Sequence, residues 1–238
     1  MMLGFLLARA SVDVVVFEKH ADFLRDFRGD TIHPSTLEIM YELGMLDSFL
    51  KLPHQEARLL NAQFGDTTVT FADFTHLPTH CKFLAFMPQW DFLNFIGERA
   101  GHYPAFHLRM SAEVTDLIEE GGRIAGVRVT TSNGPAEVRA NLVVGADGRS
   151  SLVRERAGLK VEEFGAPMDV LWLRLPRTAG DPEETTGHID VGHIFITINR
   201  GDEWQLGFVI PKGTTEQVRE RGDGCVSRNH SPARSVSS

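Results

Sequence analysis

The chain has 238 residues, of which 42% are hydrophobic and 24% are charged, so its composition excludes a collagen, a disulfide-rich scaffold and a chain disordered throughout. A formal net charge of -8 gives no electrostatic footprint for nucleic acid or an anionic membrane. Cys81 and Cys225 are too few for a disulfide framework, and no Cys/His cluster has zinc spacing. No apolar run reaches the roughly 20 residues of a membrane-spanning helix. We expect a cytoplasmic protein that binds no metal, nucleic acid or membrane.

Helices and strands alternate over the first hundred residues. The β-branched run VDVVVF at 12–17 is typical of a strand buried on both faces of a parallel sheet. Pro34 in a first turn and Gly44 as a stop delimit a helix, and Gly65-Asp66 between two apolar runs predicts a hairpin. The expected helices are 1–10, 34–41, 46–50 and 90–100, and the expected strands are 12–17, 57–64, 67–74 and 83–87.

Short strands dominate the rest of the chain. Gly-Gly at 121–122 and Asn-Gly at 133–134 predict turns between them. A short buried strand at 142–144 is expected to run into Gly-Ala-Asp-Gly at 145–148, and a helix at 151–157 follows. The other expected strands are 106–110, 113–119, 123–131, 135–139, 170–175, 193–199 and 203–210. This order predicts an α/β fold in which an antiparallel sheet interrupts a parallel nucleotide-binding part, leaving a cleft for ligands.

Glu18 ends the strand predicted at 12–17. An acidic residue at the end of the second strand of a dinucleotide-binding βαβ unit accepts hydrogen bonds from ribose hydroxyls. The strand and the helix before it are present, and the Gly-rich turn that precedes such a helix would end just before Met1. Glu18 is therefore either a ribose ligand or a charged residue that only ends a strand.

Asp147 and Gly148 lie between the predicted buried strand and the helix that follows it. Glycine lets the backbone approach a ligand closely, the carboxylate accepts hydrogen bonds from hydroxyls, and a helix start favours phosphate. The alternative is a strand–turn–helix in which Asp147 caps the helix.

Four segments together carry a resemblance to a known family. They are RASVDVVVFEK, RGDTIHPSTLEIMYELGMLD, MPQWDFLNFI and NLVVGADGRSSLVR. At these residues, and over about residues 1–212, the chain resembles the flavin-dependent aromatic hydroxylases, which are the p-hydroxybenzoate and phenol hydroxylase group of class A flavoprotein monooxygenases. Each segment alone is a weak signal, whereas the four in this order are highly specific.

The resemblance implies a set of contacts to FAD. Glu18 would bind the adenosine ribose, and Arg28 would lie by the flavin or its pyrophosphate. Gln89 would hydrogen-bond the FAD linker, and Val114 would offer its backbone to the adenine.

The Asp-Gly segment matches the family motif that serves both FAD and the pyridine nucleotide. Asp147 and Gly148 would lie at the pyrophosphate and ribityl region, and Arg154 would support their turn and contact a nucleotide phosphate.

The resemblance also implies the fold, which is a Rossmann-like FAD-binding sheet interrupted by an antiparallel substrate-domain sheet. The FAD-binding domain would comprise 1–56 and 89–160, and a partial substrate domain 57–88 and 161–215, followed by a disordered tail at 216–238. The Gly-rich turn, the later Gly-Asp motif and the final helices of the family are not in the sequence, so the chain looks like an interior fragment. Ser11 stands where the family has a glycine that closes the first helix.

In this family NAD(P)H reduces FAD, and O2 is then used to hydroxylate an aromatic ring. The resemblance therefore implies FAD as cofactor, NAD(P)H as co-substrate and a small aromatic substrate. Three interpretations stay open: an FAD-dependent monooxygenase or its FAD-binding part, an inactive remnant with the fold but no stable cofactor, and a nicotinamide-only dehydrogenase. The Asp-Gly motif and Gln89 argue against the third.

Aromatic residues of the later strands are candidates for a substrate pocket, although such side chains are more often core than contact. They are Trp172, His193, Phe195 and Phe208.

Overall fold

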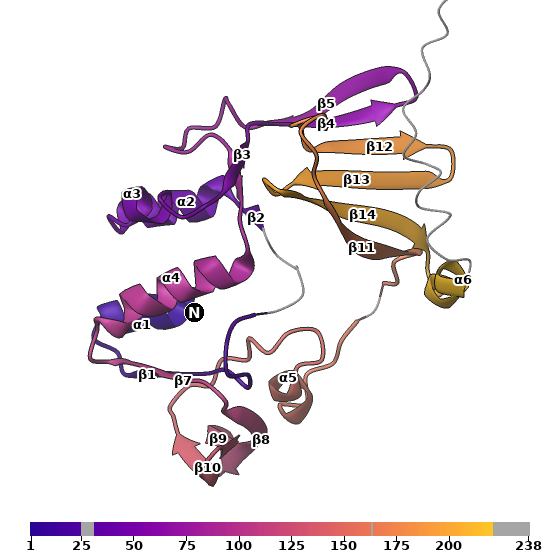
Figure 1. The fold of residues 1–238 in the computed structure, drawn as a ribbon. Helices are drawn as coiled ribbons and strands as arrows, with labels where there is room; N and C mark the ends of the chain where they lie inside the picture. The colour runs from indigo at the N-terminus through magenta and orange to yellow at the C-terminus, as the bar shows by residue number, and fades with distance from the viewer. Residues whose placement is uncertain (25–30, 163, 221–238) are drawn as a thin grey trace, which may run out of the picture. The chain divides into compact units, whose positions relative to one another are not determined.

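The computed structural model describes residues 1–24, 31–162 and 164–220, which divide into two units (Figure 1). Each unit is made of two chain segments. The first unit contains Met1–Asp30 and Pro88–Glu163, and the second contains Thr31–Met87 and Phe164–Ser238.

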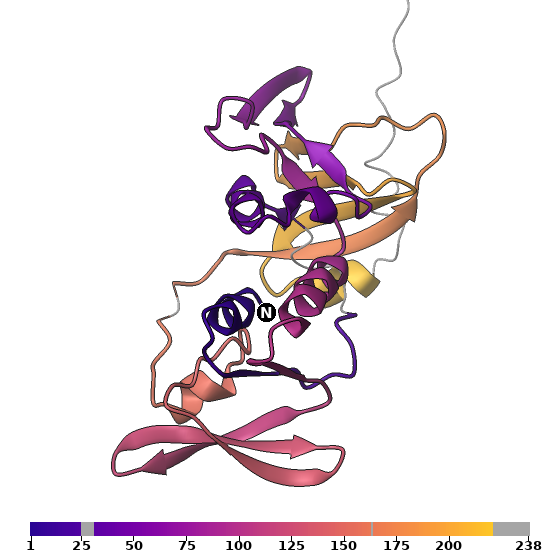
Figure 2. The same cartoon turned by 90° about the vertical axis from the view of Figure 1, so that its left-hand side faces the viewer.

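A two-stranded parallel sheet lies at the centre of the first unit. It pairs β1 (Val14–Phe17) with β7 (Phe106–Arg109). Helices α1 (Met2–Arg9) and α4 (Gln89–Gly101) contact each other and lie side by side against these strands (Figure 2). Gly4 permits this approach, because a Cβ there would lie 2.7 Å from Cγ2 of Val16.

A three-stranded antiparallel sheet completes the first unit, in the order β10-β9-β8. Its strands are β8 (Glu113–Glu120), β9 (Arg123–Thr131) and β10 (Gly134–Arg139), and helix α5 (Leu152–Arg156) contacts β8. Leu117, Val127 and Val129 form its buried cluster. The strands and turns predicted here are confirmed to within a residue or two.

The strand predicted at 142–144 is wrong. These residues join no ladder among the described strands, and Leu142 and Val144 are 76% and 55% exposed. Apolar β-branched residues favour a strand only where a neighbouring strand supplies hydrogen bonds. In the described part of the chain β1 pairs with β7 alone, and no strand lies against 142–144.

A six-stranded sheet dominates the second unit, in the order β11-β14-β13-β12-β4-β5 (Figure 1). Its strands are β4 (Leu59–Phe64), β5 (Thr67–Asp73), β11 (Met168–Pro176), β12 (Thr186–Asp190), β13 (His193–Asn199) and β14 (Glu203–Pro211). The β4–β5 hairpin is confirmed, as are the three later strands that alternation predicts. β12 escaped prediction because Thr-Gly-His-Ile-Asp has little apolar pattern.

A smaller sheet and three helices make up the rest of this unit. The sheet has the order β2-β6-β3, and its strands are β2 (Thr31–Ile32), β3 (Gln55–Ala57) and β6 (Leu84–Phe86). The helices are α2 (Pro34–Glu42), α3 (Leu46–Phe49) and α6 (Thr215–Glu220). Leu37, Met40 and Phe49 are completely buried, as the helical spacing of the first two predicts.

Two boundaries differ from the sequence prediction. Residues 31–56 group with the second unit, because β2 and β3 both pair with β6. Residues 216–220, which were expected in a disordered tail, belong to α6, and the rest of that expected tail, 221–238, lies outside the described residues.

Candidate functional site

Glu18 lies directly after β1, at the carboxyl end of the parallel pair. Its backbone N–H donates to the carbonyl of Arg109 at 2.9 Å, and its carbonyl accepts from the N–H of Ala112 at 3.0 Å. The half-buried side chain accepts a hydrogen bond from the N–H of His20 through Oε1 at 2.9 Å. The carboxylate is thereby held at the strand end, which is where a ligand binds in an open α/β sheet.

Asp147 holds the start of α5. Its Oδ1 accepts from Oγ of Ser151 at 2.5 Å, and its Oδ2 accepts from the N–H of Val153 at 3.1 Å. Partial burial raises the pKa of Asp147, but these hydrogen bonds outweigh it, and the pKa lies below its usual value. Asp147 therefore satisfies one N–H of the first turn of α5, as in the capping alternative, although Ser151 is the N-cap, and any ligand contact would be additional.

Ser151 is a structural residue of this turn that sequence reasoning passed over. It is the N-cap of α5, is buried, and accepts the N–H of Arg154 at 3.0 Å through its hydroxyl. The signal was present, because serine directly before a predicted helix is a preferred N-cap.

The two glycines of the turn have different roles. A Cβ at Gly145 would lie 2.8 Å from Cβ of Val153, so Gly145 permits the packing of α5. Gly148 has φ of +85° with nothing within 4 Å of a Cβ position, so the backbone there is open to a ligand. Arg154 fixes the same turn, because its Nη2 donates to the carbonyl of Arg149 at 2.7 Å.

One hydrophobic cluster connects several of the predicted site residues. Leu117, Val127 and Val129 form its buried part, and the half-buried side chains packed against it are Phe17, Val114, Ile124, Val138, Val143 and Val153. Phe17 precedes Glu18, while Val143 and Val153 flank Asp147 in the sequence. The cluster therefore contains Val114 together with the residue before Glu18 and residues on either side of Asp147 in the sequence.

Gln89 does not belong to this cluster. Gln89 is the half-buried first residue of α4, directly after the N-cap Pro88. Arg28 lies outside the described residues.

The aromatic candidates of the six-stranded sheet divide between its two faces. Phe208 contacts Phe195 and His193, with ring centroids 6.3 and 6.2 Å apart, whereas Trp172 lies opposite Gly207, one residue away along β14. Because side chains alternate along a strand, Trp172 projects from the other face. The sheet therefore does not gather all four into one pocket.

Metal and membrane features were searched over residues 1–24, 31–162 and 164–220. No cluster of three or more His, Cys, Asp or Glu side chains there could hold a metal ion. In the same ranges no helix has both the length and the apolar character needed to span a bilayer.

The first unit offers the kinds of chemical group that bind a dinucleotide. A carboxylate at the end of β1 suits ribose hydroxyls, and the open backbone at Gly148, next to a helix start, suits an anionic linker. Fit at Asp147 is restricted, because both of its oxygens already accept hydrogen bonds from α5.

Known proteins resemble this chain in sequence. A family model described as "FAD binding domain" matches residues 1–221. The chain is 28% identical over 233 residues to 6-methylpretetramide 4-monooxygenase of Streptomyces rimosus, covering 92% of this chain and 53% of that protein. It is 30% identical over 161 residues to a rifampicin monooxygenase of Rhodococcus hoagii, covering 65% of this chain and 30% of that protein.

Solved structures with the same fold include two kinds of flavoenzyme. PqsL of Pseudomonas aeruginosa, a probable FAD-dependent monooxygenase, matches with a TM-score of 0.78 at 20% identity, covering 96% of this chain and 63% of that one. The myxobacterial FAD-dependent halogenase CndH matches with a TM-score of 0.81 at 20% identity, covering 95% and 54%. At this identity the likeness shows the fold, which monooxygenases and halogenases share. The chain spans about half the length or less of the curated relatives named above.

Proposed function

The chain belongs to the FAD-binding domain family, and from that premise we propose that it is the FAD-binding portion of a cytoplasmic monooxygenase that hydroxylates a small aromatic compound. The observation that carries the proposal is that Val114 packs on the same hydrophobic cluster as Phe17, which precedes Glu18, and as Val143 and Val153, which lie on either side of Asp147 in the sequence. The names of curated relatives support the reaction class, since they include a 4-monooxygenase and an NADH-specific resorcinol 4-hydroxylase.

Each site residue has a proposed part in holding the cofactor. Glu18 accepts from the adenosine ribose, and the backbone of Val114 lies by the adenine. Gln89 hydrogen-bonds the linker, and Arg28 lies by the flavin or its pyrophosphate.

The Asp-Gly turn has a different part. The open backbone of Gly148 approaches the pyrophosphate and ribityl region, while Asp147 and Arg154 keep the turn in place through α5 and the carbonyl of Arg149. When bound, FAD supplies the redox chemistry that couples NAD(P)H oxidation to O2 and the aromatic ring.

A second candidate has an observation of its own. Both carboxylate oxygens of Asp147 are engaged with α5, and residues 142–144 before the turn join no described sheet. These features favour a protein that keeps the fold but binds no cofactor stably.

A titration with FAD, followed by flavin fluorescence and absorbance, separates the two candidates. Saturable binding that Glu18→Gln weakens by about tenfold supports the first, because one charge-assisted hydrogen bond is worth about 1.5 kcal/mol or more. Glu98→Gln is the matched control, since Glu98 is an exposed glutamate on α4 of the same unit. Equal weakening by both variants, or no binding by the parent chain, contradicts the first candidate. O2-dependent oxidation of NADH or NADPH with a phenolic substrate then tests the reaction.

A further inference from the structure

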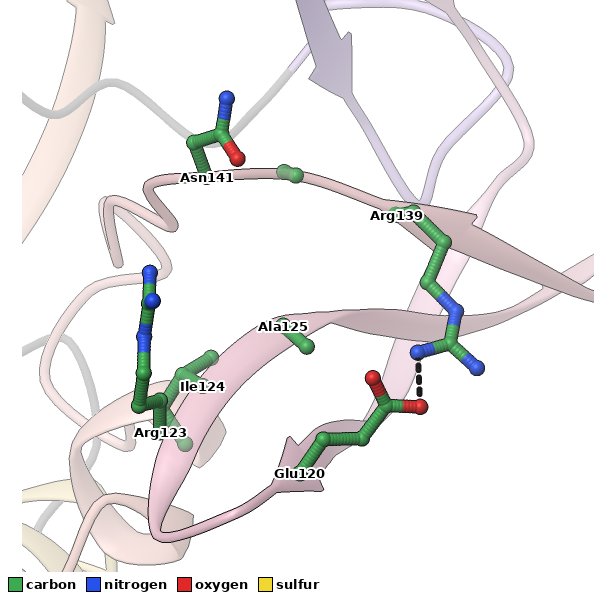
Figure 3. Close-up of a pocket in the computed structure, with 7 residues that line it drawn as sticks. Glu120, Arg123, Ile124, Ala125, Arg139 and Asn141 are labelled. Atoms are coloured by element: carbon green, nitrogen blue, oxygen red, sulfur yellow. Dashed lines mark hydrogen bonds and ion pairs between the residues drawn. The ribbon is translucent and has the colours of Figure 1, made fainter.

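An open pocket of about 420 Å³ lies at one end of the three-stranded sheet (Figure 3). Its walls come from the facing ends of β8 and β9 and from the chain that leaves β10. The lining residues are Glu120, Arg123, Ile124, Ala125, Arg139, Ala140 and Asn141.

The backbone explains why this end of the sheet is hollow. The β8–β9 register shifts between Ile118 and Glu119, so that Ala125 is an extra residue on β9. Such a bulge bends a strand and redirects its side chains. Gly126 marks the closest approach of β9 to β10, because a Cβ there would lie 2.2 Å from the carbonyl oxygen of Val138. Beyond it a single hydrogen bond, from the N–H of Ala140 to the carbonyl of Ala125 at 3.0 Å, joins the two segments before they separate.

The two arginines of the pocket differ in their state of pairing. Arg139 contacts Glu120 through Nη1 and Glu137 through Nη2, and the hydrogen bond that it donates to Glu120 raises its pKa. The Arg123 side chain has no hydrogen bond or ion pair within residues 1–24, 31–162 and 164–220, and the same holds for the side-chain amide of Asn141. Figure 3 shows the Arg123 side chain extending toward the segment that carries Asn141, with the Glu120–Arg139 pair on the opposite wall.

The lining charges leave this pocket positive in a chain with a net charge of -8. Glu120 neutralises Arg139, so the charge of Arg123 is the one still available to a ligand. A guanidinium is planar and presents paired N–H donors that match a carboxylate or a phosphate. Ile124, Ala125 and Ala140 supply a small apolar surface beside these donors.

We propose that this pocket binds a small molecule through an oxyanion group, carboxylate or phosphate, held by Arg123. None of the residues assigned to FAD lines the pocket, although Ile124 packs on the same hydrophobic cluster as Val114.

Amide chemical shifts of the full chain, followed by NMR during titration, test the site. The probes are ADP for a phosphate source and benzoate for a carboxylate source, at constant ionic strength. The amides of residues 123–125 and 140–141 are expected to shift together and to saturate with one of the two probes. Arg123→Gln should weaken that binding by about tenfold, which is the value of one charge-assisted hydrogen bond. Arg123→Lys keeps the charge but loses the paired N–H donors of the guanidinium, so its affinity should lie between those of the parent chain and Arg123→Gln.

Arg109→Gln is the matched control, because Arg109 is an exposed arginine of the same unit outside the pocket. If Arg109→Gln weakens binding as much as Arg123→Gln, the effect is one of net charge and the proposal fails. It also fails if neither probe shifts the pocket amides, or if Arg123→Gln retains the parent affinity while its spectrum shows the native fold.

Discussion

Ser11 closes the first helix in a conformation that favours glycine. Its φ is +62°, its N–H donates to the carbonyl of Ala8 at 2.9 Å, and the N–H of Val12 donates to the carbonyl of Leu7 at 3.0 Å. This pair of hydrogen bonds is the Schellman motif, which satisfies two of the last carbonyls of the helix. The serine side chain adds strain that glycine would not have.

We therefore expect Ser11→Gly to raise the free energy of unfolding by about 1 kcal/mol, since a left-handed residue with a Cβ costs about 1–2 kcal/mol. Urea unfolding followed by circular dichroism measures it. Gly44 provides the reverse control, because it closes α2 at φ of +69° with the same two hydrogen bonds. Gly44→Ser should lower the stability by a similar amount, and a stabilising effect there would refute the argument.

Ser151 and Asp147 together satisfy the first N–H groups of α5. Ser151→Ala removes the N-cap and leaves the Asp147 carboxylate without its hydroxyl donor. We expect a loss of about 1 kcal/mol in the free energy of unfolding, which is the usual value of an N-cap. Ser35→Ala, a serine inside α2 and not its N-cap, is the control. Equal losses in both variants would show that the cap contributes nothing.

At the scale of elements, Gly126 sets the distance between β9 and β10. Any side chain there would collide with the carbonyl of Val138, and the glycine has φ of +154°. Gly126→Ala should therefore lower the free energy of unfolding by about 1–3 kcal/mol, the usual cost of overpacking. Thermal unfolding measures it. Gly134, with φ of +102° and open space around it, separates backbone strain from collision. If Gly134→Ala lowers the free energy of unfolding as much as Gly126→Ala does, the collision with the Val138 carbonyl contributes nothing to the loss.

A strap of chain between β5 and β6 is tied to α2 by Glu38. Oε2 of Glu38 accepts a hydrogen bond from the backbone N–H of His80 at 2.9 Å, and Oε1 of Glu38 lies 2.8 Å from Nδ1 of the His80 ring. The imidazole of His80 stacks on Tyr41. The backbone hydrogen bond from His80, followed by that of its side chain, holds the pKa of Glu38 below its usual value.

A carboxylate with a lowered pKa in the folded state contributes stability above its unfolded pKa and loses it as the pH falls through the folded pKa. Glu38→Gln should therefore reduce the fall in melting temperature between pH 5 and pH 3. Glu42→Gln, on the same helix without a strap contact, should leave the slope as in the parent chain. If the melting temperature of Glu38→Gln falls with pH as steeply as that of the parent chain, the contact between Glu38 and His80 does not contribute to the loss of stability in acid.

Sequence patterns predicted correctly those helices and turns that depend on residues close together in the chain. The 3.6-residue spacing in α2 and α4 and the Gly-Asp turn of the β4–β5 hairpin each determine their element from a few neighbouring residues. It failed at 142–144, because an apolar run becomes a strand only beside a partner that the run itself does not specify. At the site, the residues named around Asp147 are brought together. Their roles were not decidable in advance, since a carboxylate accepts equally from a helix N–H or a ligand hydroxyl.

At the scale of the whole molecule, the sheets differ in how far apart their strands lie along the chain. β8, β9 and β10 are consecutive in the sequence. β1 and β7 are separated in the sequence by Thr31–Met87, which is the first segment of the second unit. Pairing between distant segments has a larger entropic cost of loop closure and is slow.

Pulsed hydrogen exchange during refolding should therefore protect the amides of 123–131 before those of 14–17. The rate of protection at 106–109 should match that at 14–17, because the two strands form one ladder. Earlier protection at 14–17 would mean that α1 and β1 form a stable unit without β7.

The late pairing of β1 has a consequence for synthesis in the cell. A ribosome releases Val14–Phe17 long before Phe106 emerges, and until then this apolar β-branched segment has no strand of the native pair beside it. Short segments of this kind associate with one another when exposed. The yield of folded protein should therefore respond more to translation speed and to chaperones that hold nascent chains than the stability of the finished fold would suggest.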